Sequence, residues 1–337
     1  MTQDRPATIA VYYEHPQWFE RLFAELDRRG LPYRKVLATE HVLDPAAPAD
    51  PSEIVFNRMS ASAATRDHAD ALAFSLDVLA GYALRGVPVI NGARAYAYEI
   101  SKAKQLALIG SLGLRFPKTR IIHRADQAAA AARDLRFPIV FKPNIGGRGA
   151  GVVRFDDLAV LAQTAAAGAL DLGFDSVALL QEYVPKRDNK ITRVEVLGGE
   201  YLYAIDVTTS AETFDLCPAD ICRVPAPVAV GETCAAEPAP TVTAVRANPP
   251  ADAVADAVRI VRAAGIDVGG VEFLVDDRDG TRLFYDINAL SNFVASPLET
   301  LGFDPWERLG AYLEARARGG ASAGARALAG AATAGAS

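Results

Sequence analysis

Cysteine and histidine are scarce in this chain. Its 337 residues include three cysteines, Cys217, Cys222 and Cys234, which show neither a C-x-x-C spacing nor a histidine nearby. This pattern argues against a disulfide framework and a structural zinc site, and it favours reduced thiols. The histidines are scattered, so no Ser-His-Asp or Cys-His arrangement stands out for nucleophilic catalysis. The four are His15, His41, His68 and His123.

Long apolar runs and an excess of basic residues are also missing. No stretch of about 18 apolar residues predicts a membrane span. The first residues, MTQDRPATIAVYYEHPQ, lack the basic start and apolar core of a signal peptide, so we expect a cytoplasmic protein. The net charge of −6 argues against nucleic acid or a membrane surface as a partner. Hydrophobic residues make up 50% of the chain, which is enough for a sizeable core.

What is present first is an alternation of strand and helix patterns over residues 1–92. Apolar runs predict strands at 7–13, 32–38, 52–59 and 87–91, and amphipathic patterns predict helices at 16–30 and 67–85. Strands that alternate with helices form a parallel sheet with helices on its faces. We therefore expect an N-terminal α/β unit with a parallel sheet.

The next stretch contains a lysine followed by a glycine-rich loop. Helices are predicted at 94–113, 125–135 and 157–168, and strands at 117–123, 137–142, 152–155 and 176–184. Lys142 ends one of these strands, and four glycines follow within nine residues in FKPNIGGRGAGVVRF, residues 141–155. Glycine lets the backbone approach a ligand closely, so the loop indicates a site where N–H groups face an anion.

A third unit is predicted from residue 185 onward. Two alternating strands at 190–197 and 200–207 flank Gly198-Gly199, which is a hairpin signal. Residues 210–250 are rich in proline and contain every cysteine, and we expect them to be mostly irregular. Asn248 is expected to cap a helix that has Pro249 at its first position. The tail from residue 319 is low in complexity, and we expect it to be disordered.

Two carboxylates come together in the predicted hairpin VEFLVDDRDGTRLFYDINALSN, residues 271–292. A turn near Asp279 would place Glu272 roughly opposite Asp286, and Asn288 would share their face of the sheet. The alternate residues are expected to point into a core. They are Val271, Phe273, Tyr285 and Ile287.

Like charges opposite one another destabilise a sheet unless a cation lies between them. Asp, Glu and Asn supply the oxygen ligands that Mg²⁺ prefers, and Mg²⁺ commonly bridges such ligands to phosphates. The hairpin therefore indicates a metal site formed by Glu272, Asp286 and Asn288, with Mn²⁺ as an alternative ion. On this pattern alone, a solvated polar face without a ligand stays open.

Six segments in this order resemble the ATP-grasp enzymes. They are SKAKQLALIGSLGLRFPKT, FKPNIGGRGAGVV, LQEYV, KITRVEVLGGE, GVEFL and FYDINALSN. The resemblance is greatest to the RimK-like branch, which includes the ribosomal protein S6 glutamate ligases and the glutathione synthetase-like carboxylate–amine ligases. It covers roughly residues 50–315.

The resemblance implies an α/β (α+β) architecture, the ATP-grasp fold, preceded by a parallel α/β pre-ATP-grasp domain. The expected divisions are 1–92 for that domain, 93–184 for a subdomain with the glycine-rich loop, 185–318 for a subdomain with the metal site, and 319–337 for the tail. Relatives are commonly dimers or tetramers, so a homodimer or a homotetramer is implied.

Site residues follow from the resemblance position by position. Lys102 and Lys142 would contact phosphates, and Arg193 would face the triphosphate or an acyl-phosphate. The other positions expected to bind ATP are Gly146, Arg148, Gly149, Gly151, Gln181, Glu182, Tyr183 and Val184. Arg148 could equally be a loop charge in solvent, and Gln181 could be an ordinary strand residue.

Three departures from the family pattern bear on the site. Asp286 replaces the more usual glutamate, which shortens the reach of this metal ligand. Ile191 stands where relatives often carry an aspartate, so Asp188 becomes the candidate for ribose recognition. Residues 210–250 lack the arginine–asparagine–glycine run of the glutamate ligases, which implies a substrate other than ribosomal protein S6.

The implied activity is an ATP- and Mg²⁺-dependent carboxylate–amine ligase that forms an amide through an acyl-phosphate. Its substrates would be an amino acid, a peptide or a small carboxylate, together with an amine. The substrate candidates are Arg58, Ser291 and Asn292, although Arg58 could instead form a structural ion pair. Two alternative functions stay open. One is a kinase on the same scaffold, and the other is a nucleotide-binding protein without turnover.

Overall fold

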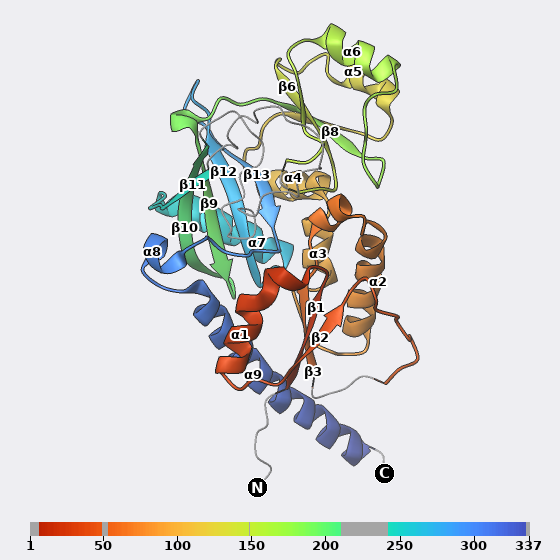
Figure 1. Ribbon diagram of the computed structural model, residues 1–337, viewed down its shortest axis with the longest axis vertical. Coiled ribbons are helices and arrows are strands. Elements are labelled where there is room, and N and C mark those ends of the chain that lie inside the picture. The colour runs from red at the N-terminus through yellow and green to blue at the C-terminus, as the bar shows by residue number, and fades with distance from the viewer. Residues whose placement is uncertain (1–6, 49–52, 148, 210–241, 335–337) are drawn as a thin grey trace, which may run out of the picture.

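The computed structural model describes residues 7–48, 53–147, 149–209 and 242–334, and the side chains up to Gly319. It contains three β-sheets, each with its own helices (Figure 1). The mixed α/β architecture expected from the sequence is confirmed. None of the helices within these ranges is long and apolar enough to cross a membrane.

The first sheet is fully parallel, as the alternating pattern predicts. Its order is β2-β1-β3-β4. The strands are β1 (Thr8–Tyr13), β2 (Tyr33–Leu37), β3 (Glu53–Arg58) and β4 (Val89–Ile90). The connecting helices are η1 (Pro16–Phe19), α1 (Glu20–Arg28), η2 (Ala61–Arg66) and α2 (Asp70–Leu84).

The helix predicted at 94–113 is two helices, α3 (Ala93–Glu99) and α4 (Lys102–Ser111). The chain is extended at Ser101, with φ −151° and ψ 101°, and the Ser101 side chain accepts a hydrogen bond from the Lys104 N–H. A serine in this role is an N-cap, so it starts a new helix and does not continue the old one. The break places Lys102 in the first turn of α4.

The second sheet carries the glycine-rich loop. It is antiparallel with the order β5-β8-β6-β7, and β6 and β7 flank the loop as expected. Its strands are β5 (Thr119–Ile122), β6 (Ile139–Pro143), β7 (Val153–Phe155) and β8 (Ala178–Glu182). Its helices are η3 (Ala125–Gln127), α5 (Ala128–Ala131) and α6 (Leu158–Ala166).

The third sheet is antiparallel with the order β11-β10-β9-β12-β13. A short turn, η4 (Arg187–Asn189), leads into it, and helix α7 (Ala251–Ala264) packs on it. The strands are β9 (Lys190–Leu197), β10 (Glu200–Thr209), β11 (Val242–Arg246), β12 (Val268–Val275) and β13 (Arg282–Asn288).

Two expectations about residues 210–250 need correction. Strand β11 lies within the stretch expected to be irregular, whereas 210–241, with the three cysteines, lie outside the described residues. Helix α7 begins at Ala251 after Pro250, and no side chain caps it. Two successive prolines keep the preceding residues extended, so Asn248 is too far from the helix to be its cap.

The chain ends in two helices, α8 (Pro297–Leu301) and α9 (Pro305–Ala334). Disorder was expected from residue 319, but α9 continues through this stretch to Ala334. The reason lies in composition, because the stretch is rich in alanine, the residue with the highest helix propensity.

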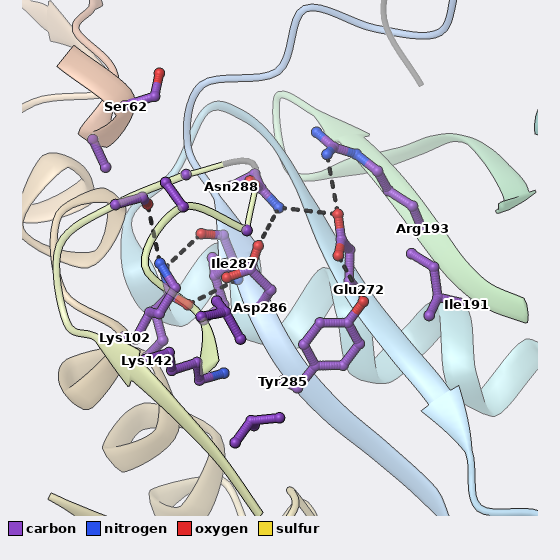
Figure 2. A pocket seen from close by; sticks show the side chains of 18 of the residues that line it. Ser62, Lys102, Lys142, Ile191, Arg193, Glu272, Tyr285, Asp286, Ile287 and Asn288 are labelled. Carbon is purple, nitrogen blue, oxygen red and sulfur yellow. Dashed lines mark hydrogen bonds and ion pairs between the residues drawn. The ribbon is translucent and has the colours of Figure 1, made fainter. Parts of the chain in front are cut away.

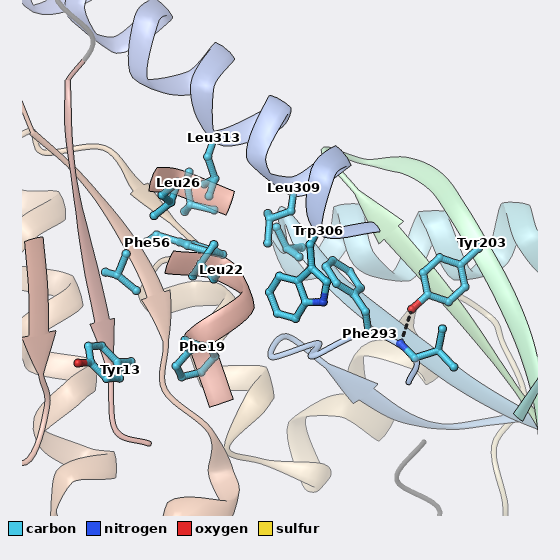
Figure 3. Close-up of a cluster of buried hydrophobic side chains, with 14 of the residues drawn as sticks. Tyr13, Phe19, Leu22, Leu26, Phe56, Tyr203, Phe293, Trp306, Leu309 and Leu313 are labelled. Atoms are coloured by element: carbon cyan, nitrogen blue, oxygen red, sulfur yellow. Dashed lines mark hydrogen bonds between the residues drawn. The ribbon is translucent and has the colours of Figure 1, made fainter. Parts of the chain in front are cut away.

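Helix α9 joins the first and third units through a shared core (Figure 3). Leu309 and Leu313 on α9 are fully buried, and they belong to the same cluster as Leu22 and Phe56 of the first unit. Trp306 packs edge-on against Phe293, which follows β13. The first unit is therefore held against the third sheet by apolar contacts and is not an independent body.

Candidate active site

The two carboxylates of the β12–β13 hairpin lie opposite one another, as the sequence predicts. Glu272 pairs with Asp286 across the strands. The Asn288 amide lies beside both, with Nδ2 3.0 Å from Asp286 Oδ2 and 3.5 Å from Glu272 Oε1 (Figure 2). Three oxygen-bearing side chains thus share one face of the sheet.

Tyr285 was expected to point into the core, but its hydroxyl donates to Glu272 Oε2 over 2.8 Å. The cause is a β-bulge: Glu272 pairs with Asp286, but the next residue, Phe273, pairs with Phe284. The extra residue at 285 falls out of the alternation and joins the carboxylate face. Val271, Phe273 and Ile287 are buried in the core as expected.

The electrostatics of this face suit a cation. Burial and the neighbouring Asp286 carboxylate raise the pKa of Glu272 to about 7, against the opposing effect of Arg193. Two carboxylates held this close are costly to ionise together, and a divalent ion removes that cost. Among the described residues, no group of three or more His, Cys, Asp or Glu could hold a metal. The third donor here would be the Asn288 amide oxygen, and the amide, whose nitrogen faces both carboxylates, would have to turn over to present it.

Arg193 extends from β9 toward the same carboxylates. Its Nε lies 2.6 Å from Glu195 Oε1 and its Nη1 3.2 Å from Glu272 Oε1. Burial alone would lower the pKa of Arg193, but the two carboxylates outweigh burial and raise it. The guanidinium is therefore a permanent positive charge beside the carboxylate face.

Lys142 approaches from the second sheet at the end of β6. It is 8% exposed, and its Nζ donates to Gln181 Oε1 on β8 over 2.9 Å. Burial, and then the nearby charge of Lys102, lower the pKa of Lys142 to about 8, although Asp286 and Glu272 act in the opposite direction. Gln181 thus orients the Lys142 side chain and is not merely an ordinary strand residue.

Lys102 and the glycine-rich loop meet beside Lys142. Lys102 Nζ donates to the Gly146 carbonyl over 3.0 Å. Gly151 has φ +72°, and a Cβ there would lie 2.9 Å from Pro143 Cγ, so the loop requires glycine at this position. Arg148 lies outside the described residues.

These groups surround one cavity of about 300 Å³ between the second and third sheets. Most of the predicted site residues line it, including the carboxylate face, both lysines and the residues of strand β8. They are Lys102, Lys142, Gly146, Gly149, Gln181, Glu182, Tyr183, Val184, Arg193, Glu272, Asp286, Asn288 and Asn292. The first unit contributes Trp18, Ser60, Ala61 and Ser62 to the wall.

Asp188, the candidate for ribose recognition, is not among the residues that line this cavity. It is exposed in the left-handed turn η4, with φ 55°. Lys186 and Ile191, which stand on either side of it in the sequence, do line the cavity.

Arg58 also lies behind the cavity wall and does not line it. It is 1% exposed, its Nη2 donates to the Ser291 carbonyl and to Asn292 Oδ1, and Phe19 and Phe56 flank its guanidinium. Burial lowers the pKa of Arg58 to about 9, partly offset by Glu99 and Glu195. Its contacts support the segment after β13, but they are hydrogen bonds to uncharged oxygens and not the ion pair considered as the alternative. Ser291 is likewise fully buried.

Sequence reasoning missed Glu99, the last residue of α3. Its carboxylate accepts hydrogen bonds from Ala289 N–H at 2.7 Å, Leu290 N–H at 3.1 Å and Ala61 N–H at 3.4 Å. Burial raises the pKa of Glu99, against these hydrogen bonds. Glu99 thus connects the first unit to the residues that follow β13. No local sequence signal predicts such a contact.

Comparison with solved structures defines the class of protein. The D-alanine–D-alanine ligase of Bacillus anthracis, in complex with ATP, superposes with a TM-score of 0.63 over 93% of this chain and 97% of its own, at 13% identity. The ATP-grasp ligase PsnB was solved in complex with a phosphomimetic variant of its minimal precursor, Mg and ADP. It superposes with a TM-score of 0.62 over 93% of this chain and 99% of its own, at 16% identity. The protein therefore has the ATP-grasp fold.

Sequence comparison is more specific. Residues 100–214 match the family model of the RimK-like ATP-grasp domain, so the chain carries a RimK-like ATP-grasp domain, and the resemblance drawn from the six segments is confirmed. The large chain of carbamoyl phosphate synthase from Thermus thermophilus is 29% identical over 210 residues, which are 60% of this chain. The chain spans only 18% of the length of that relative.

Proposed function

We propose that the protein is an ATP- and Mg²⁺-dependent carboxylate–amine ligase that forms an amide bond through an acyl-phosphate. The observation that carries the proposal is the composition of the cavity. Two lysines and a glycine-rich loop line one side, and paired carboxylates with an arginine line the other. Such a site can hold a triphosphate and stabilise charge on a transferring phosphoryl group.

In this proposal ATP occupies the cavity with its adenine against Glu182, Tyr183 and Val184. The phosphates extend toward Lys142, Lys102 and the glycine-rich loop, whose backbone N–H groups would contact them. The ribose would lie beside Lys186 and Ile191, which line the cavity, and not beside Asp188, which does not. Gln181 keeps Lys142 directed into the cavity.

Glu272, Asp286 and Asn288 would hold the divalent cation. The donor set fits Mg²⁺, because all three side chains carry oxygen and a divalent ion would offset the repulsion between the Glu272 and Asp286 carboxylates; Mn²⁺ accepts the same ligands. A cation bound here would neutralise charge on the β- and γ-phosphates. Asp286 reaches less far than a glutamate and would be monodentate.

The reaction needs positioning and charge stabilisation more than a covalent nucleophile on the protein. A substrate carboxylate oxygen attacks the γ-phosphorus, the bond to the β-phosphate oxygen breaks, and ADP leaves. The neutral amine then attacks the carbonyl carbon of the acyl-phosphate, phosphate leaves, and the nitrogen loses one proton as the amide forms. Arg193 and Lys142 are the side chains proposed to stabilise the negative charge in these steps.

The proposed substrates are an amino acid or a peptide as carboxylate donor and an amine as acceptor. Support comes from solved structures with the same fold, which include a ligase for D-alanine and a ligase bound to a precursor peptide. Asn292, on the cavity wall, is the proposed substrate contact, with Arg58 and Ser291 behind it. The divisions at 1–92, 93–184 and 185–318, a homodimer or homotetramer, and a cytoplasmic location belong to the same proposal.

The test is phosphate release from Mg²⁺-ATP with a panel of amino acids and short peptides, with products identified by mass spectrometry. A product lighter by one water than its two substrates together establishes the ligase. Lys142→Ala and Asp286→Ala should abolish it, whereas Lys104→Ala, an exposed lysine on the same helix as Lys102, should not. A product that gains one phosphate group would instead identify a kinase, and ATP binding without any turnover would remove the support for the ligase.

A further inference from the structure

Glu195 is a buried carboxylate next to the candidate site. It lies two residues after Arg193 on β9, so the two side chains share one face of the sheet. Strand β9 pairs with strand β12, so that Arg193 lies opposite Glu272 and Glu195 lies opposite Gly270. A second carboxylate therefore stands next to the one that is proposed to bind the cation.

Gly270 makes room for this arrangement. A Cβ at Gly270 would lie 2.9 Å from Glu195 Oε1 and 3.1 Å from Arg193 Nε. Any larger residue would push the ion pair away from the sheet. The space above Gly270 is thus filled by the contact between Arg193 and Glu195.

Arg193 is shared between two carboxylates, and Glu195 is the closer partner. The distance from Nε to Glu195 Oε1 is 2.6 Å. The distance from Nη1 to Glu272 Oε1, the contact drawn in Figure 2, is 3.2 Å. Glu195 is 1% exposed, and its Oε2 has no hydrogen-bond partner among the described residues. Arg193 is the one ion-pair partner of Glu195 within the described ranges, although the Glu195 charge also acts on the buried Arg58.

Glu195 and Glu272 both contact Arg193, but only Glu272 is also proposed to bind the cation. Arg193 contacts Glu272 Oε1, so a cation bound by Glu272 would compete with Arg193 for this carboxylate. A buried guanidinium left with Glu272 as its sole counter-ion would hold that carboxylate strongly, because an unpaired buried charge is costly. A second counter-ion removes this competition.

We propose that Glu195 is a positioning residue: it neutralises and orients Arg193, and it thereby leaves Glu272 available to the divalent cation. The inference rests on the proposed function, since it takes Glu272 as a cation ligand. Residues that orient metal ligands typically change metal affinity 10- to 100-fold when they are removed. A merely structural role for Glu195 would not act on metal affinity through Arg193.

The experiment measures Mn²⁺ binding by electron paramagnetic resonance in the presence of a non-hydrolysable ATP analogue. Glu195→Gln keeps the shape but removes the charge, so Arg193 turns to Glu272 and Mn²⁺ affinity should fall roughly 10-fold or more. In the double variant Arg193→Gln/Glu195→Gln no guanidinium competes, and affinity should return close to that of the wild type. Glu200→Gln, at an exposed glutamate on the adjoining strand β10, is the matched control and should change nothing.

A second comparison does not depend on the single variant folding. If Glu195 acts only through Arg193, then Arg193→Gln and the double variant bind Mn²⁺ equally well. Unchanged affinity in folded Glu195→Gln, or a further loss when Glu195→Gln is added to Arg193→Gln, would overturn the inference. Failure of the wild type to bind Mn²⁺ would overturn the proposed metal site, and the inference with it.

Discussion

At the residue scale, burial of Lys142 makes folding, and nucleotide binding at the proposed site, depend on pH. Its pKa of about 8 lies well below the usual 10.5, because the folded protein buries the charge next to Lys102. Compared with the unfolded chain, the folded protein favours the neutral form of Lys142. Between about pH 8 and pH 10.5 the unfolded chain still carries this proton and the folded protein has lost it, so folding becomes more favourable as pH rises through this interval. A bound triphosphate would favour the charged form and reverse the shift.

We therefore expect ATP binding at pH 8.5 to take up a fraction of a proton and to weaken as pH rises further. Calorimetric titrations in buffers of different ionisation enthalpy measure this uptake. Lys142→Met should abolish it, and Lys104→Met, at an exposed position of α4, should not. Equal heats in all buffers for the wild-type protein would contradict the assignment.

Gly151 is a second residue whose backbone sets the site. Its φ of +72° and the 2.9 Å approach of a Cβ to Pro143 make alanine unfavourable there. We expect Gly151→Ala to cost about 1–3 kcal/mol and to raise the KM for ATP, because the loop can no longer keep its path. Urea unfolding and steady-state kinetics measure the two effects. Gly81→Ala in helix α2, where the nearest atom would be 3.7 Å away, should leave both unchanged or improve stability.

The sequence predicts part of the site at this scale. Glu272 and Asp286 are equidistant from Asp279, so simple alternation places them opposite one another, and the structure agrees. Tyr285 could not be placed, because a β-bulge shifts the alternation by one residue and its position depends on how the strand meets its neighbour. Glu195 follows Arg193 by two, but only the glycine at 270 on another strand reveals the room for both.

At the scale of elements, the break between α3 and α4 has two consequences. It starts a helix at Lys102, and it leaves Glu99 at the end of α3, facing the backbone that leaves β13. Periodicity alone continues one helix through this region, because both helices keep apolar residues at helical spacing. Ser101 is the signal that could have located the break, since serine favours the N-cap position.

Glu99 should therefore matter for stability through elements distant in sequence. Its two oxygens accept three backbone N–H groups, from Ala61, Ala289 and Leu290. Glu99→Gln replaces one oxygen by a donor and leaves buried N–H groups unsatisfied, at a cost of about 1–3 kcal/mol. Urea unfolding measures the loss, and Glu40→Gln, at an exposed position, is the matched control. A change equal to that of the control would show that this link contributes nothing.

At the scale of the whole molecule, the first unit and the third sheet meet in one apolar core. The sequence predicts the sheets separately, because each has its own periodic pattern. It does not show that α1 and β3 pack against α9, since the pattern of a helix does not say which unit its apolar stripe will cover. The contact positions Ser62 and Trp18 on the wall of the cavity across from the third sheet.

Leu313 tests whether this shared core couples the two units. It is fully buried on α9, in the cluster that contains Leu22 and Phe56 of the first unit together with Tyr203 of the third sheet (Figure 3). Leu313→Ala removes apolar contacts and leaves a cavity, so we expect the free energy of unfolding to fall by about 2–5 kcal/mol.

Because the cluster spans both units, the loss should appear as a single unfolding transition. Hydrogen exchange would show it as weaker protection in β3 and in β10 alike, whereas Leu84→Ala, at a side chain that is 89% exposed, should alter neither. Weaker protection confined to β3 would mean that the first unit opens on its own, and that its wall of the cavity is held by the polar contacts of Glu99 and Arg58 instead.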